Sequence, residues 1–246
     1  MTVMKRTDCF RVFSLLTASL CFFSCGLDTE DFVETPESVH TVNYTNADPT
    51  QQYFSFVTTE HYSDSEFVFE GTEVYYKIYS NVSSMVRVEQ NIDTLSETQQ
   101  ATSLIDSYGY KTLKLSSGDT PTPLITATGH NRHVYIRLTD LISSSNSDYI
   151  ASICVTSSAI SKCDTSAILG YPRRFVNYRY GFNFTQNSDN PRPSSSDNDF
   201  SGSSSASTYY VDVYAVAVGR NSSSSTRSYS KVLRLGSLSI NPSDFS

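Results

Sequence analysis

The sequence has 246 residues and a formal net charge of −7, with 38% hydrophobic, 17% charged and 13% aromatic residues. This apolar and aromatic content can fill a core, which excludes a wholly disordered chain. The acidic balance argues against a nucleic-acid-binding protein, because such proteins need a basic face to offset phosphate charge. The 17 Tyr and 14 Phe residues favour strands over a helical bundle.

The first 24 residues have the features of an export signal. An apolar run covers residues 12–23 and is too short to span a bilayer comfortably. Before it stand the basic residues Lys5, Arg6 and Arg11, and after it comes Ser24-Cys25-Gly26, a cysteine flanked by small residues. An ordinary secretory signal or a buried first strand are the alternative interpretations.

The cysteine junction resembles the lipobox of a bacterial lipoprotein. In that family signal peptidase II cuts before the cysteine, whose thiol carries a diacylglyceryl group and whose new amine is acylated. Phe22 stands where the family usually has Leu, and such loosened lipoboxes resemble those of spirochaetes. The resemblance implies a signal peptide over residues 1–24, acylation (palmitate) of Cys25, and a lipid anchor at the outer membrane or the periplasmic face of the bacterial cell envelope.

Residues 25–49 are expected to form an acidic, flexible tether. Acidic, Pro-punctuated segments with few apolar residues repel themselves and stay extended. Asp48 and Pro49 are typical of a turn into the folded part, which is expected to cover residues 50–246.

Alternation of apolar and polar residues with period two predicts strands through most of this folded part. The clearest alternation covers residues 176–184 and indicates one buried and one wet face. The other predicted strands cover residues 53–57, 67–69, 73–79, 85–89, 110–115, 124–127, 133–141 and 149–155.

One segment has helical spacing instead. Its apolar positions are Ile92, Leu95, Leu104, Ile105 and Tyr108. Asn91 or Asp93 can cap its start and Gly109 can end it. We therefore expect one inserted helix near residues 92–108, which crosses between sheets.

Residues 186–207 are rich in Ser, Asn and Asp, and we expect a long exposed loop there, as for the shorter 221–226. Such a loop is either a binding element on a rigid scaffold or a solvated connection, and its composition favours the second interpretation.

The last two predicted strands, residues 209–217 and 230–235, resemble the F and G strands of fibronectin type III domains. In that family a tyrosine starts the F strand and aliphatic residues at alternate positions fill the core, as Tyr209, Val211 and Val213 do here. Residues 73–79 resemble the C strand more loosely, and the whole is similar to treponemal lipoproteins. The resemblance implies a mainly β protein, an enlarged antiparallel β-sandwich of the fibronectin III or immunoglobulin-like kind. Two small sandwiches split near residues 116–123 are the alternative to one domain.

The cysteines agree with export. Cys154 and Cys163 remain once the signal is removed, and an even pair in an exported protein predicts a disulfide, with two buried thiols as the alternative. A zinc site with His130 and His133 is a weaker possibility, because the cysteines are too far apart for a zinc knuckle. No metal or other cofactor is expected.

Enzymatic motifs are scarce. The sequence has no Gly-rich phosphate loop, no nucleophile elbow and no H-E-x-x-H pattern. Asp164-Thr165-Ser166 resembles the active-site loop of aspartic proteases, but that chemistry needs a second such carboxylate and no second triplet occurs. We therefore expect an ordinary turn at Asp164 and no enzyme.

Arginines and tyrosines gather in one stretch, where forked hydrogen bonds and ring stacking suit carboxylates, sulfated sugars or aromatic partners. Pairing with surface carboxylates is the alternative role of these arginines. The candidate ligand-binding residues are Arg173, Arg174, Tyr178, Arg179 and Tyr180. The function expected is a membrane-anchored, non-enzymatic binding lipoprotein that faces a host or envelope protein or a glycan. The alternative is a structural or assembly lipoprotein confined to the periplasm.

Overall fold

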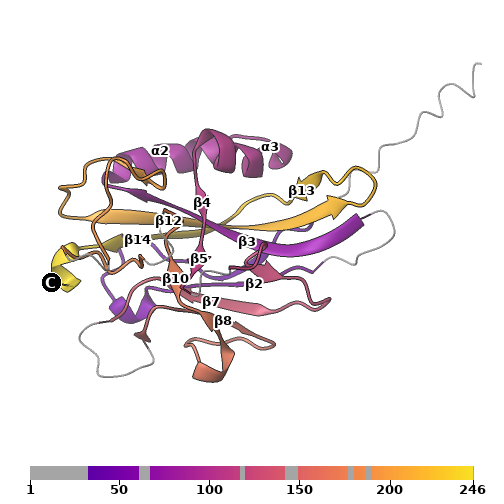
Figure 1. The fold of residues 1–246 in the computed structure, drawn as a ribbon, viewed down its shortest axis with the longest axis horizontal. Coiled ribbons are helices and arrows are strands. Elements are labelled where there is room, and N and C mark those ends of the chain that lie inside the picture. The colour runs from indigo at the N-terminus through magenta and orange to yellow at the C-terminus, as the bar shows by residue number, and fades with distance from the viewer. Residues whose placement is uncertain are drawn as a thin grey trace, which may run out of the picture. The chain divides into compact units, whose positions relative to one another are not determined.

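A computed structural model describes residues 33–60, 67–116, 120–141, 149–176, 180–186 and 190–245. These residues form three layers, with helices α2 and α3 on one sheet and that sheet on a second one (Figure 1). The prediction of a mainly β protein is confirmed. The predicted signal peptide, Cys25, the start of the tether, Tyr178 and Arg179 lie outside the described residues.

The outer sheet has five strands in the order β1-β2-β7-β8-β9, all antiparallel. Their bounds are β1 Glu37–His40, β2 Phe54–Val57, β7 His133–Arg137, β8 Ser152–Thr156 and β9 Ile168–Gly170. Short 3-10 turns flank this sheet at η1 (Pro49–Gln51) and η4 (Thr165–Ala167), and another, η5 (Pro242–Phe245), lies near the C-terminus.

The central sheet is built on two long antiparallel strands, β3 (Phe67–Tyr79) and β12 (Tyr209–Asn221). β14 (Leu233–Ile240) and β13 (Arg227–Tyr229) continue it beyond β12. The strands that resemble C, F and G are therefore neighbours, in the order β3-β12-β14. Strands from both sides of residues 116–123 pair within each sheet, β3 with β12 and β2 with β7.

Three two-residue strands share the outer edge of β3. β6 (Ile125–Thr126) pairs at Gly71–Thr72 and β4 (Lys111–Thr112) at Tyr75–Tyr76, both antiparallel. β11 (Phe200–Ser201) pairs in parallel at Ile78–Tyr79. A further two-stranded sheet joins β5 (Lys114–Leu115) to β10 (Pro172–Arg173).

Both faces of the central sheet are buried, because successive side chains of a strand point to opposite faces. On β12, Val211, Val213 and Ala215 enter the core between the two sheets. Tyr214 and Val216 of the same strand pack with the helices instead. Because both faces are buried, residues 209–218 of β12 form a nearly continuous apolar run, in which Asp212 is the one charged residue.

The helical layer begins earlier than the sequence predicts. α2 covers Val82–Asp93, where Asn81 Oδ1 caps the start by accepting from the amide of Ser84 at 3.1 Å. α3 covers Glu97–Thr102 and runs into a π-helical turn, η2 (Ser103–Ser107). The predicted strand at residues 85–89 is wrong: Met85, Glu89 and Ile92 are buried at helical spacing, and the polar Glu89 hid that pattern.

The second half of the predicted tether belongs to the folded unit, which corrects the boundary at residue 49. Val33 and Val42 are 2% and 5% exposed, and β1 pairs with β2. Val42 bridges Gly236 in the middle of β14, where the backbone has φ +104° and a Cβ would collide with the Val42 carbonyl. The free energy gained by burying these apolar side chains exceeds the repulsion among the acidic residues that favours an extended segment.

The predicted strand over residues 176–184 is also wrong for the part that the structure describes. Residues 175–176 and 180–184 lie in bends and irregular backbone. Phe182 and Phe184 are nevertheless buried in the core, as the alternation predicted. The segment turns back on itself, since the Arg174 amide donates to the Tyr180 carbonyl at 2.7 Å and the Thr185 amide to the Asn190 carbonyl at 2.8 Å.

Candidate functional site

Arg174, one of the predicted ligand-binding residues, is a buried structural residue. Its side chain is 1% exposed and its Nη2 lies 2.6 Å from Asp199 Oδ1 and 2.7 Å from Asp197 Oδ2. Tyr76 donates its hydroxyl to Asp199 Oδ2 at 2.5 Å. We call Arg174, Asp197, Asp199 and Tyr76 the Arg174 cluster. The binding prediction is wrong for Arg174, because every charge around it is already paired in the interior.

The Arg174 cluster also corrects the prediction for residues 186–207. Asp199 is 0% exposed and the backbone of this segment joins the central sheet through β11. The Ile78 amide donates to the Asp199 carbonyl at 2.9 Å. A segment with a solvated composition is therefore held in place by the ion pairs of Arg174 with Asp197 and Asp199 and by a short strand, while residues 201–205 are exposed as predicted.

Arg173 and Tyr180 are both half-buried, and the structure does not gather them with Arg174 into an open face. Arg173 lies in β10 and its guanidinium packs against Gly181, where a Cβ would come within 2.6 Å of Nη1. The remaining two candidates, Tyr178 and Arg179, lie outside the described residues. Arg173 and Tyr180 stay candidates for the border of a binding surface.

A group of exposed apolar side chains precedes these residues in the chain. Four large apolar side chains between residues 169 and 176 are 38–42% exposed: Leu169, Tyr171, Phe175 and Val176. Among the described residues only Val39 joins them as an exposed large hydrophobic residue. Two ammonium groups lie over the Phe175 ring, Lys111 at 5.8 Å and Lys114 at 5.5 Å from its centroid. We call these six residues the 169–176 patch.

Sequence reasoning missed most of the 169–176 patch. Val176 begins the predicted strand over residues 176–184, and the sequence patterns assign no role to Leu169 or Phe175. Lys111 and Lys114 come from β4 and β5, which pair with β3 and β10, so only the tertiary structure brings them to Phe175. The available signal was the run of apolar and basic residues over 169–176, which lacks the acidic residues common elsewhere in the chain.

Cys154 and Cys163 form a disulfide with their Cα atoms 5.7 Å apart, which confirms the predicted pair. Because both sulfurs are engaged, the zinc alternative with His130 and His133 is wrong. In the ranges that the structure describes, no group of His, Cys, Asp and Glu side chains is placed to hold a metal ion.

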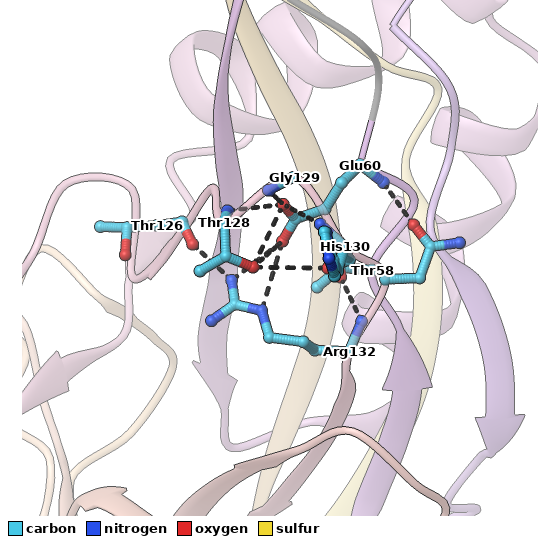
Figure 2. A network of polar contacts seen from close by, with 8 residues as sticks. Thr58, Glu60, Thr126, Thr128, Gly129, His130 and Arg132 are labelled. Atoms are coloured by element: carbon cyan, nitrogen blue, oxygen red, sulfur yellow. Dashed lines mark hydrogen bonds and ion pairs between the residues drawn. The ribbon is translucent and has the colours of Figure 1, made fainter.

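The turn that carries His130 holds a carboxylate instead. Figure 2 shows Glu60 surrounded by this turn, with Oε2 accepting from the amides of Thr128 and Gly129 at 2.6 Å each and of His130 at 3.2 Å. Arg132 adds an ion pair to Oε1 at 3.0 Å, and the Glu60 side chain is 1% exposed. Successive amides of this kind form an anion-binding concavity, which here the chain's own carboxylate fills.

Asp164 forms the turn that the sequence predicts. Its Oδ1 accepts from the Ser166 amide at 2.9 Å and from the Ser166 hydroxyl at 3.0 Å, at the start of η4. The amide bond, with the hydroxyl bond next, lowers the pKa of this exposed carboxyl below its usual range. The carboxylate is used as a turn cap.

A second buried charge cluster lies on the helical face of the central sheet. Asp212 is 0% exposed and accepts from the Tyr110 hydroxyl at 2.5 Å, while Arg234 Nε lies 3.6 Å from its other oxygen. Arg234 also forms an ion pair with Glu89 of α2. We call Arg234, Glu89, Asp212 and Tyr110 the Arg234 cluster. Burial, followed by the charge of Glu89, raises the pKa of Asp212 to about 7.

A pocket of about 630 Å³ lies beside residues 239–245, near the C-terminus. Its wall comes from residues 44–52, from the end of β7 with residues 139–141, and from residues 239–245. Arg137, 1% exposed, contributes a guanidinium to this wall. The pocket is separate from the 169–176 patch, with which it shares no lining residue.

Comparisons with family models, with curated proteins and with solved structures found no match. No helix within the described ranges is long and apolar enough to cross a membrane.

Proposed function

We propose that the chain is a lipid-anchored, non-enzymatic binding protein of the bacterial cell envelope, and that the 169–176 patch contacts an acidic segment of a protein partner. The observation that carries this proposal is the concentration of exposed apolar side chains beside two lysines in one short stretch. Exposed apolar surface of this kind marks interaction sites in soluble proteins.

The chemistry of the patch favours an acidic partner. Aromatic rings contribute contact area at a low cost in side-chain entropy, and the lysines attract carboxylates. Within the described residues neither lysine forms an ion pair, although Lys114 partly offsets the rise in the pKa of the buried Glu73. The positive charge of Lys111 is therefore the more available of the two to a partner. The charge of the patch thus opposes the net charge of −7 of the chain.

Two features support export and anchoring. The resemblance of the Cys25 junction to a lipobox supports a lipid anchor, and the disulfide between Cys154 and Cys163 is typical of proteins outside the reducing cytosol. The neighbour order β3-β12-β14 supports a fibronectin-like sandwich, in which strands C, F and G share one sheet.

Metabolic labelling with a radioactive fatty acid tests the anchor. Wild-type protein is expected to be labelled and Cys25→Ala is not. Labelling that persists in Cys25→Ala would place the acceptor elsewhere. Protease treatment of intact cells then separates the two locations: digestion of the 169–176 patch supports a surface-facing protein, and full protection leaves the periplasmic assembly role.

Binding to an immobilised copolymer of glutamate and tyrosine tests the patch. We expect saturable binding by wild-type protein and a loss of about tenfold in Phe175→Ser and in Lys114→Gln, since each removes a contact of roughly 1.4 kcal/mol. Lys231→Gln, an exposed lysine paired with Glu97, is the matched control and should bind as wild type. Equal binding by all four proteins contradicts the proposal.

A further inference from the structure

The pocket near the C-terminus has a size and a set of polar groups that match a small oligosaccharide. Its volume of about 630 Å³ lies inside the range of small-molecule sites, roughly 300–1,000 Å³. Three separate chain segments build it, so its shape depends on the folded sandwich.

Arg137 supplies a fixed cation on the pocket wall. Its Nε donates to the Thr139 carbonyl at 3.1 Å and its Nη2 to the Pro49 carbonyl at 2.6 Å, with Nη1 3.5 Å from the Thr50 carbonyl. Its partners among the described residues are these carbonyl oxygens, the Tyr135 side chain and the Tyr149 ring, 5.4 Å away. A guanidinium has five N–H donors, so these four hydrogen bonds leave one donor on this held side chain.

Other groups of the pocket also retain bonding capacity. Asn46 and Asn241 use their Oδ1 atoms, for the Asp48 amide and the Thr208 hydroxyl respectively. Within the described part of the chain, their Nδ2 groups and the carboxylate of exposed Asp244 have no hydrogen-bond partner. The pocket therefore offers amide donors, a cation and the carboxylate of Asp244, with Tyr44 as an aromatic wall. Its other carboxylate, Asp140, already accepts from the Ala151 amide and from Asn183.

This mixture disfavours most ligand classes. An anion would meet the carboxylates of Asp140 and Asp244, and a cation would meet Arg137. A hydroxyl group both donates and accepts, so a ligand with several hydroxyls can satisfy amides and carboxylates together. Its C–H faces can also pack on Tyr44. We propose that this pocket is a binding site for a neutral saccharide.

The position of the pocket is compatible with the lipid anchor proposed at Cys25. This point alone in the subsection rests on the proposed function. Val33 packs with Phe67, Phe69 and Ala217, at the end of β12 opposite to Tyr209. Tyr209 pairs with Ile240, which lines the pocket, and Ala217 lies eight residues further along β12, so the pocket and the Val33 contacts are about 27 Å apart. The chain therefore enters the folded sandwich on the side of β12 away from the pocket.

Binding of purified mature protein to an array of bacterial and animal glycans tests the proposal. We expect retention by neutral saccharides, and a decrease of about tenfold in affinity for a retained glycan in Asp244→Ala and in Asn46→Ala. Ala47→Trp removes no polar contact but fills the pocket, and should abolish binding. Asp93→Ala, which removes an exposed carboxylate at the end of α2, is the control and should bind as wild type.

Three outcomes overturn the saccharide site: no retention on the array, unchanged binding in Ala47→Trp with a native circular dichroism spectrum, or retention of spermidine in place of glycans. Fatty-acid labelling at Cys25 and binding of the glutamate–tyrosine copolymer are measured in the same variants. Failure of the saccharide site leaves both readouts intact, so it is distinguishable from failure of the proposed function.

Discussion

The Arg174 and Arg234 clusters have the same composition, an arginine, two carboxylates and a tyrosine, yet they hold charge differently. They lie on opposite faces of the central sheet, since Tyr76 packs between the sheets and Tyr110 packs with the helices. Arg174 is 1% exposed and contacts both carboxylates within 2.7 Å, whereas Arg234 is 39% exposed and lies 3.6 Å from Asp212.

The two clusters differ in how closely the arginine contacts its carboxylates. Burial by itself lowers the pKa of Arg174, but hydrogen bonds from its guanidinium to Asp199 and Asp197 raise that pKa above its usual value. In the Arg234 cluster, burial raises the pKa values of both Asp212 and Glu89, because the partly exposed guanidinium contacts Glu89 but offsets the burial of the two carboxyls only in part. Equal residue types thus give a permanent ion pair on one face and a titrating pair on the other.

Arg174→Met is expected to have the largest effect, because it leaves Asp199 buried without its cation. Breaking a buried pair in this way costs about 3–5 kcal/mol of unfolding free energy. Urea denaturation of this variant measures the loss, with exposed Arg87→Met as the control. A loss below about 1 kcal/mol, the value of a surface pair, would contradict the description of this cluster.

Asp212→Asn is expected to flatten the dependence of stability on pH. The folded-state pKa of Asp212, about 7, lies above its usual value of 3.8, so the folded protein binds more protons than the unfolded chain between these pH values. The contribution of Asp212 to stability is therefore full below pH 4 and is lost as the pH rises through 7, by on the order of 4 kcal/mol. Glu73, whose pKa burial raises to about 7, adds a similar dependence that the variant retains. Unfolding free energies at several pH values measure the slope, and an unchanged slope in Asp212→Asn would show that Asp212 is ionised throughout.

The Glu60→Gln variant tests whether backbone amides stabilise a buried carboxylate as a buried arginine does. The amide side chain loses its charge-assisted bonds from Thr128, Gly129 and Arg132. Such a loss costs about 1–3 kcal/mol. Thermal unfolding at neutral pH measures it, and Glu37→Gln, exposed on β1, is the control. A Glu60→Gln variant as stable as this control would mean that the network of Figure 2 adds little to stability.

Glu89→Gln gives the smallest change and separates the two carboxylates of the Arg234 cluster. Removal of the Glu89 charge is expected to lower the pKa of Asp212, since that charge raises it. Carbon-13 NMR titration of the Asp212 carboxyl follows the change, which should be about one pH unit. A rise of the Asp212 pKa in this variant would mean that Glu89 acts mainly by holding Arg234.

The two long strands of the fold were predictable from their alternating positions. β3 and β12 have aliphatic and aromatic residues at alternate positions, which predict strands although both of their faces are buried. The start of α2 was missed because Glu89 is a charged residue at a buried helical position. Residues 180–184 were misassigned because the same alternation occurs in a segment held by loop contacts with Asn190.

The site was less predictable than the fold. Arg174 is locally typical of a surface arginine, and only Asp199, distant along the chain, makes it an interior residue. The lysines around Phe175 arrive from β4 and β5 in the same way. Pairing between charges that are distant along the chain leaves no local pattern in a single sequence. Whether a given arginine or lysine is exposed could therefore not be derived from the sequence.

The three short strands along β3 have a consequence for solubility. A strand of 13 residues with an open edge would offer a template on which other chains could pair. β6, β4 and β11 cover that edge in separate two-residue pieces, one of which runs in the opposite direction to the others. Neighbouring copies of the protein therefore meet an edge too interrupted to nucleate intermolecular β-sheet.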